Sequence, residues 1–192
     1  MTIPSDDDLI HELRAGNNDS LGLLVARWEG PLYRFVYRLL DRKDEARDIC
    51  QETFLRILKK SDRFREGARF STWMYQIALN LCRDQVRRRR RWGAIIDERA
   101  ESPAETGAAI RSAPWDPAAE LETRERAAAV TRALALIPPE QREVLVLKEF
   151  EGLKFREIAE ILGCPESTVK SRMYYGLTGL KSALARQGID RT

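Results

Sequence analysis

The chain has 192 residues, of which 43% are hydrophobic and 33% charged, and its formal net charge is +3. No run of about 18 apolar residues occurs, so no membrane-spanning helix is predicted. The acidic start, MTIPSDDDLIHEL, is unlike a secretory signal, and we expect a cytoplasmic protein. One histidine and three widely spaced cysteines (Cys50, Cys82 and Cys164) form no metal-binding pattern, so we expect buried thiols, no metal and no other cofactor.

Helical periodicity dominates the sequence, and no stretch alternates with the two-residue period of a strand, which predicts an all-α fold. Ser5 is a candidate N-cap for a first helix because three aspartates follow it. The run AGNNDS at residues 15–20 should end that helix and begin a second one. Further helices are expected over residues 31–40, over residues 44–60 and after Ser71.

The helix expected over residues 44–60 has a regular apolar stripe and an unusual polar face. The stripe comprises Ala46, Ile49, Cys50, Thr53, Phe54 and Ile57. The opposite face carries Asp48, Gln51, Glu52 and Leu55. Most polar faces are simply solvated, but a leucine ringed by polar side chains is typical of protein interfaces and favours a contact with a partner.

The segment FSTWMYQIALNLCRDQVRRRRR, residues 70–91, predicts a helix with two distinct faces. The core face should hold Phe70, Met74, Ile77, Ala78 and Leu81. A second stripe carries Trp73, Gln76, Asn80, Arg83 and Arg87. Aromatic rings stack on bases, amides read base edges and cations follow phosphates, so this stripe is typical of single-strand binding. The alternatives are a core position for Trp73 and a solvated face for the arginines, although the repulsion within the arginine run favours an anionic partner.

Residues 93–119, GAIIDERAESPAETGAAIRSAPWDPAA, lack an apolar stripe and are rich in Gly, Ala, Ser and Pro. This composition predicts a flexible acidic linker between two small helical domains, residues 1–92 and residues 120–192. Helical pattern resumes near Pro117 and breaks at the Pro138-Pro139 pair. One more helix is expected over residues 140–151.

The segment from residue 153 to residue 184 predicts a helix–turn–helix. Gly163 supplies a left-handed helix stop, and Pro165 presets the start of the second helix. The core stripe of that second helix should comprise Val169, Met173, Leu177, Leu180 and Leu184. The outward face comprises Ser167, Thr168, Ser171 and Tyr175, flanked by Lys170 and Arg172. Hydroxyls suit base edges and cations suit phosphates, so this face favours entry into the DNA major groove over a packing role alone.

Three segments of the chain, in this order, resemble those of the extracytoplasmic-function (ECF) sigma factors, group IV of the sigma-70 family. EARDICQETFLRI resembles the polymerase-clamp helix, and residues 70–91 resemble the promoter-melting segment. LIPPEQREVLVLKEFEGLKFREIAEILGCPESTVKSRM resembles the C-terminal helix–turn–helix domain. The run Tyr174-Tyr175-Gly176-Leu177 departs from the family, and its glycine and Gly179 should each weaken the helix by about 1 kcal/mol relative to alanine.

The resemblance implies a non-enzymatic sigma factor that directs core RNA polymerase to promoters. It implies that residues 1–92, sigma region 2, bind the β′ clamp helices through the face around Gln51. The same domain would hold −10 DNA through the Trp73 stripe and cup a flipped base with the loop at residues 61–69. Residues 120–192, sigma region 4, would read the −35 element and touch the β flap, with the linker directed toward the RNA exit channel. An anti-sigma factor is a further implied partner.

An alternative interpretation is a stand-alone helix–turn–helix transcriptional regulator. It accounts for residues 120–185 but leaves the stripe at residues 73–87 without a role.

Overall fold

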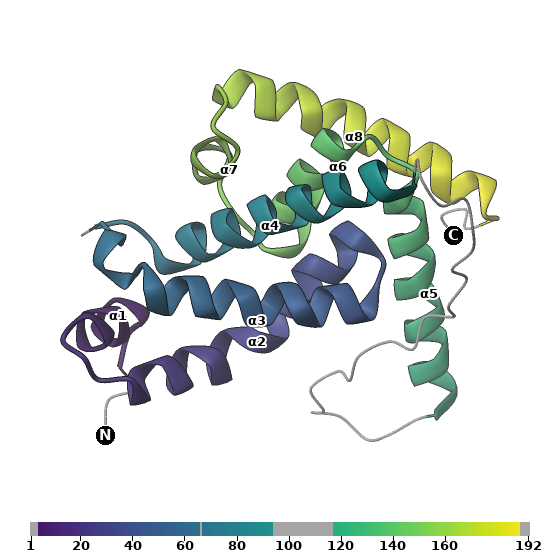
Figure 1. Cartoon of the computed structure of the whole chain (residues 1–192). Helices are drawn as coiled ribbons and strands as arrows, with labels where there is room; N and C mark the ends of the chain where they lie inside the picture. Colours follow the sequence, from purple (N-terminus) through teal and green to yellow (C-terminus); the bar gives the residue numbers. More distant parts are fainter. Residues whose placement is uncertain (1–3, 66, 94–116, 189–192) are drawn as a thin grey trace.

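The computed structural model describes residues 4–65, 67–93 and 117–188, and every regular element in these ranges is helical. The all-α prediction is therefore confirmed for this part of the chain (Figure 1). The main helices are α1 (Asp6–Arg14), α2 (Asp19–Leu40), α3 (Lys43–Lys59), α4 (Phe70–Gly93), α5 (Pro117–Ala135), α6 (Pro139–Leu145), α7 (Phe155–Leu162) and α8 (Glu166–Arg186). A 3₁₀ turn, η1 (Ser61–Arg63), follows α3, and a π-helical turn, η2 (Val146–Phe150), continues α6. None of the helices in the described ranges is long and apolar enough to cross a membrane.

The first two helices show one confirmed prediction and one wrong one. Ser5 caps α1 as expected, because its Oγ accepts a hydrogen bond from the Asp8 backbone N–H at 3.2 Å. The separate helix expected over residues 31–40 does not exist, since α2 runs unbroken through Pro31. An interior proline costs about 3 kcal/mol, but an unbroken helix lets Leu24 and Leu32 bury one common face.

Helices α1 to α4 form the N-terminal domain. All six residues of the apolar stripe predicted for α3 are buried, which confirms that stripe. On α4 the predicted core face is also confirmed: Phe70, Met74, Ala78 and Leu81 are buried, and Ile77 is partly buried against the core. The burial of Tyr75, Leu79 and Cys82 on the same helix is a second buried face that the periodicity did not indicate.

Helices α5 to α8 form the C-terminal domain and include the predicted helix–turn–helix. Gly163 ends α7 with φ 64°, the left-handed stop expected there. The helix expected over residues 140–151 is divided into α6 and the π turn η2. The predicted core position of Leu177 is wrong, since this side chain is 45% exposed. Instead Gly176 lies buried against α6, which turns the buried face of α8 away from Leu177.

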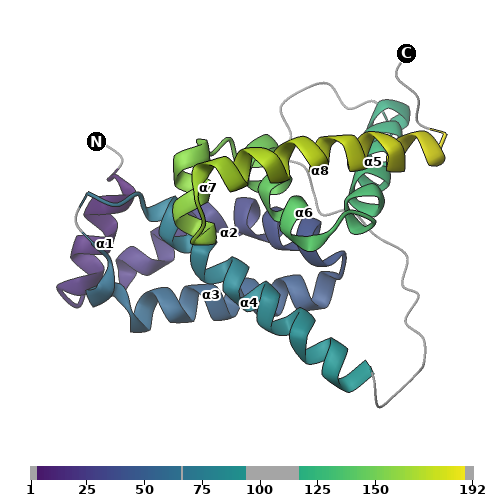
Figure 2. The same ribbon diagram turned by 90° about the horizontal axis from the view of Figure 1, so that it is seen from above.

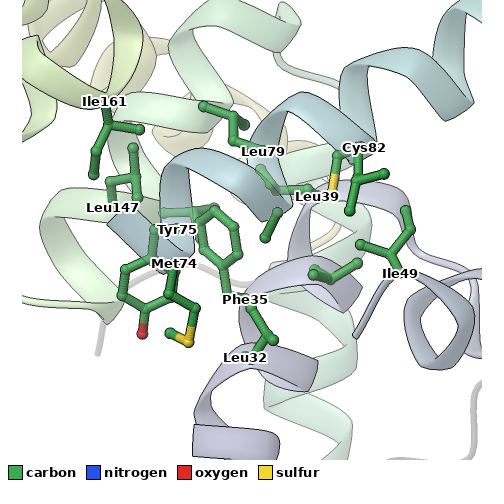
Figure 3. Close-up of a cluster of buried hydrophobic side chains, with 14 of the residues drawn as sticks. Leu32, Phe35, Leu39, Ile49, Met74, Tyr75, Leu79, Cys82, Leu147 and Ile161 are labelled. Carbon is green, nitrogen blue, oxygen red and sulfur yellow. The ribbon is translucent and has the colours of Figure 1, made fainter. Parts of the chain in front are cut away.

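The two domains pack against each other and share one buried hydrophobic cluster. Helix α4 packs against α3 and against α7. Figure 1 shows α4 between α3 and the helices α6 and α7, and Figure 2 shows that α4 crosses α3 at an angle. Figure 3 shows Tyr75 and Leu79 of the N-terminal domain beside Leu147 and Ile161 of the C-terminal domain. On the second buried face of α4, Tyr75 and Leu79 thus lie where this helix meets the other domain, and the Tyr75 ring also packs on Phe35 of α2.

Candidate DNA and polymerase interfaces

The N-terminal part of α8 offers an open polar surface. Ser167, Lys170, Ser171 and Tyr175 are exposed, and Thr168 and Arg172 are half-buried. The Ser171 hydroxyl donates to the Ser167 carbonyl at 3.1 Å, so it is engaged only by its own helix. Lys170 forms an ion pair with Glu166 at 2.8 Å, one helical turn away. These side chains lie at the surface where a recognition helix needs them.

An aromatic patch extends this surface along α8. Tyr174 is 69% exposed and Tyr175 is 61% exposed, and their rings meet edge to face with centroids 5.5 Å apart. Leu177 continues the same exposed run. Of these three, the sequence placed only Tyr175 on the outward face. The departure from the family pattern at residues 174–177 was the signal for the other two.

The predicted nucleic-acid stripe on α4 is divided by the fold. Gln76, Asn80 and Arg87 are exposed. Trp73 is half-buried, with its ring 5.4 Å from that of Phe64, so it packs on the core while part of its side chain reaches the surface.

Arg83 is committed within the chain. Its Nε and Nη2 donate to the two carboxylate oxygens of Glu143 on α6, at 2.8 and 2.6 Å. This hydrogen bonding raises the pKa of the Arg83 guanidinium.

The arginine run after Arg83 is also partly compensated internally. Arg89 donates to Glu45 of α3 at 2.7 Å, and Arg87 pairs with Asp84 on its own helix. The repulsion expected within the run is therefore relieved in part by carboxylates of the protein itself.

The predicted polymerase face of α3 lies at the surface. Asp48, Gln51 and Leu55 are exposed, and Leu55 is 47% exposed. Glu52 is half-buried and accepts a hydrogen bond from Arg56 at 2.8 Å, which lowers the pKa of the Glu52 carboxyl. The face forms a ridge between two hollows. Gln51 and Leu55 border the hollow toward α2, and the two acids border the hollow toward α4.

The hollow toward α2 is a groove of about 1270 Å³ that the sequence did not indicate. Apolar and aromatic side chains of α2 and α3 line it, among them Val25, Tyr33, Tyr37, Phe54 and Leu55. Five cationic side chains also line it, Arg34, Arg38, Lys43, Arg47 and Arg126, together with the acid Glu29. One wall comes from α5, including Val130. The groove is therefore complete only while the two domains are packed together.

Polar contacts accompany the apolar packing between the domains. The Tyr75 hydroxyl donates to Glu151 at 2.5 Å, and Arg38 lies 3.8 Å from the same carboxylate. Burial raises the pKa of Glu151. Arg142 donates to the Leu39 carbonyl at 2.7 Å, so a C-terminal side chain caps the end of α2.

Known proteins similar to this chain identify its family. Residues 24–92 match the family described as Sigma-70 region 2, and residues 119–178 match Sigma-70, region 4. The ECF RNA polymerase sigma factor SigW of Bacillus subtilis is 32% identical and aligns over 91% of this chain and 94% of its own length. The chain belongs to the ECF sigma factors. Like other sigma factors, it directs core RNA polymerase to promoters and initiates transcription.

Further relatives agree with this ECF sigma factor assignment. The RNA polymerase sigma-H factor of Pseudomonas aeruginosa is 28% identical over 96% of both chains. The sigma factor RpoE of Bartonella quintana, solved in complex with the anti-sigma factor NepR, is 26% identical with a TM-score of 0.71 and covers 91% of this chain and 99% of its own. CnrH in complex with the cytosolic domain of CnrY shares the fold, at 24% identity and a TM-score of 0.70. The stand-alone regulator is not favoured, because it leaves the region 2 match unexplained.

Proposed function

We propose that this sigma factor binds the β′ clamp helices of core polymerase through the α3 face formed by Asp48, Gln51, Glu52 and Leu55. The observation that carries this assignment is the exposure of Leu55 among polar neighbours, since a single water-exposed leucine in such a ring suits the centre of a protein contact. The same domain, residues 1–92, then presents α4 to the melted −10 strand. The exposed amides Gln76 and Asn80 read base edges, and Trp73 stacks on a base. Arg83 and Arg87 hold phosphates of the same strand.

The C-terminal domain, residues 120–192, reads the −35 element and contacts the β flap. Helix α8 enters the major groove with Ser167, Thr168 and Ser171 toward base edges and with Lys170 and Arg172 toward phosphates. The loop at residues 61–69 cups a flipped base. Residue 66 of this loop lies outside the described residues. So do residues 94–116, which make up most of the proposed acidic linker at residues 93–119.

A cytoplasmic place of action and the absence of any catalytic step of its own belong to the same proposal. Polymerase supplies the chemistry, and this chain supplies promoter recognition.

An anti-sigma factor is the proposed regulatory partner, and the groove beside Leu55 suits one of its helices. Between Leu21 and Arg38 the α2 wall is about 25 Å long at 1.5 Å per residue, enough for a helix of about 17 residues. The apolar and cationic side chains that line the groove suit a helix with an apolar stripe and acidic flanks. Such a helix would compete with polymerase for Gln51 and Leu55, which border both surfaces.

A pull-down with core polymerase tests the α3 assignment. Reversing the charge at Asp48 and Glu52 should weaken binding at least tenfold, because both side chains lie on the proposed face. The matched control reverses Asp7 on α1 and Asp19 on α2, two exposed carboxylates of the same domain outside α3. Equal retention of both double variants would show that polymerase binds elsewhere.

The −35 assignment has its own test. A Ser171→Asn chain should select a different −35 sequence from a randomised promoter library, while its non-specific affinity for duplex DNA stays close to that of the parent. Selection of the parental sequence would remove Ser171 from the base-reading set.

A further inference from the structure

The contact between Arg83 and Glu143 joins the helix proposed to hold −10 DNA to the other domain. The two residues are 60 positions apart, and the guanidinium uses one complete edge, Nε and Nη2, to bond both carboxylate oxygens. The Glu143 side chain is 8% exposed and that of Arg83 is 34% exposed. The contact is thus sheltered but lies at the rim of the domain interface.

Arg83 is the cation that compensates the Glu143 carboxylate, which sits beside the buried Val144 and Leu145. A buried carboxylate without a partner is costly, so the two hydrogen bonds from Arg83 offset the cost of burying the Glu143 side chain. When the domains separate, both ions return to water. A pair of this kind therefore adds little net stability to the closed arrangement and leaves it free to open.

Two further ion pairs between the domains also join an acid of the C-terminal domain to an arginine of the N-terminal domain. Glu151 faces Arg38, and Glu157 faces Arg69 at 2.5 Å. In all three pairs the acid belongs to the C-terminal domain and the cation to the N-terminal domain. Two of the cations, Arg69 and Arg83, belong to the segments proposed to bind −10 DNA, whereas Arg38 lines the groove between α2 and α3.

The closed arrangement is too small to hold both promoter elements. A compact chain of this length has a radius of gyration of about 16 Å. Elements centred at −35 and −10 are separated by roughly 85 Å of duplex at about 3.4 Å per base pair. Binding both elements requires the domains to separate, and separation breaks the pair between Arg83 and Glu143.

We propose that the Glu143 carboxylate accepts the two Arg83 hydrogen bonds that a DNA phosphate would otherwise accept. This one carboxylate thereby restrains DNA binding by the closed chain. The edge of an arginine that grips a carboxylate with two hydrogen bonds grips a phosphate in the same way. When the two domains separate on polymerase, Arg83 releases the Glu143 carboxylate and binds a DNA phosphate in its place. This inference rests on the proposed role of Arg83 in −10 binding.

The test measures binding of the full chain, without polymerase, to a fluorescent single-stranded 20-nucleotide DNA of random sequence, by anisotropy. Glu143→Gln keeps the side-chain volume and removes the competing charge. It should tighten binding about tenfold, the usual scale of one charge-assisted hydrogen-bonded contact. It should also steepen the dependence of log K on log salt by about 0.7, the increment for one added phosphate contact. The control Glu149→Gln removes an exposed charge from the same domain and should change affinity less than twofold.

Two further variants make the result decisive. In an Arg83→Gln background the gain from Glu143→Gln should vanish. If Glu143→Gln fails to fold by circular dichroism, Glu143→Asp replaces it, because a carboxylate one methylene shorter cannot hold both nitrogens, and binding should then tighten to a smaller extent.

Equal affinity of the Glu143 and Glu149 variants, or a gain that survives without Arg83, would overturn the inference. If the inference fails in this way but the parent chain still supports run-off transcription with core polymerase, the proposed function stands. A parent that gives no transcript with core polymerase would instead contradict the proposed function.

Discussion

Two glycines on α8 provide a matched test of how the recognition helix is held. An added Cβ at Gly176 would lie 3.1 Å from Cδ1 and Cγ of the buried Leu145 and 3.3 Å from the Gln141 carbonyl oxygen. At Gly179 the nearest atom, on Ile137, is 3.8 Å away, an ordinary contact. Either alanine gains about 1 kcal/mol in helix propensity. Only Gly176→Ala must also force atoms into a packed core, at a cost of roughly 1–3 kcal/mol.

We therefore expect Gly176→Ala to lower the free energy of unfolding by about 1 kcal/mol and Gly179→Ala to raise it by up to about 1 kcal/mol. For a chain of this length the two melting temperatures should differ by about 4–8 °C. Thermal melts followed by circular dichroism measure this difference. Equal shifts for the two alanines would refute the close approach of α8 to α6 at Gly176. The sequence-based expectation of similar weakening at both glycines predicts that equal result.

Three further predictions concern single side chains. Trp73→Ala should reduce the permanganate reactivity of −10 thymines more than it reduces initial promoter binding. It should also lower the melting temperature, because the ring packs on the core. Normal thymine reactivity would contradict a stacking role for Trp73. Arg172→Ala should weaken duplex binding about equally across sequences and reduce the salt slope by roughly one, whereas a sequence-dependent loss would make it a base-reading residue. At pH 8 a thiol reagent should modify the partly exposed Cys164 quickly, and Cys50 and Cys82 only on unfolding. The reason is that burial raises the pKa of Cys50 to about 12 and also raises that of Cys82. Rapid modification of all three thiols would contradict this burial.

The local sequence pattern was sufficient to predict helices that bury a single apolar stripe. The α3 stripe from Ala46 to Ile57 is the clearest case, since each apolar residue there is buried. The turn at Gly163 was also predictable, because a glycine between two apolar stripes of helical spacing typically adopts the left-handed conformation that ends a helix. The continuation of α2 through Pro31 was not predictable, because the compensating burial comes from tertiary packing.

Features that depend on long-range contacts could not be predicted. The buried position of Gly176 follows from its contact with Leu145, which no periodicity on α8 encodes. Likewise, Arg83 fits a DNA-facing stripe by sequence, and only the packing of α6 on the N-terminal domain shows that Glu143 holds it. The groove beside Leu55 needs a wall from α5, so neither domain alone predicts it.

Run-off transcription from a library of genomic fragments, with core polymerase in the presence and absence of this chain, tests the central claim most directly. The account predicts discrete transcripts that require both components and begin downstream of one shared pair of −35 and −10 sequences. Tight binding of the chain alone to a duplex site, with no transcript when polymerase is added, would contradict it.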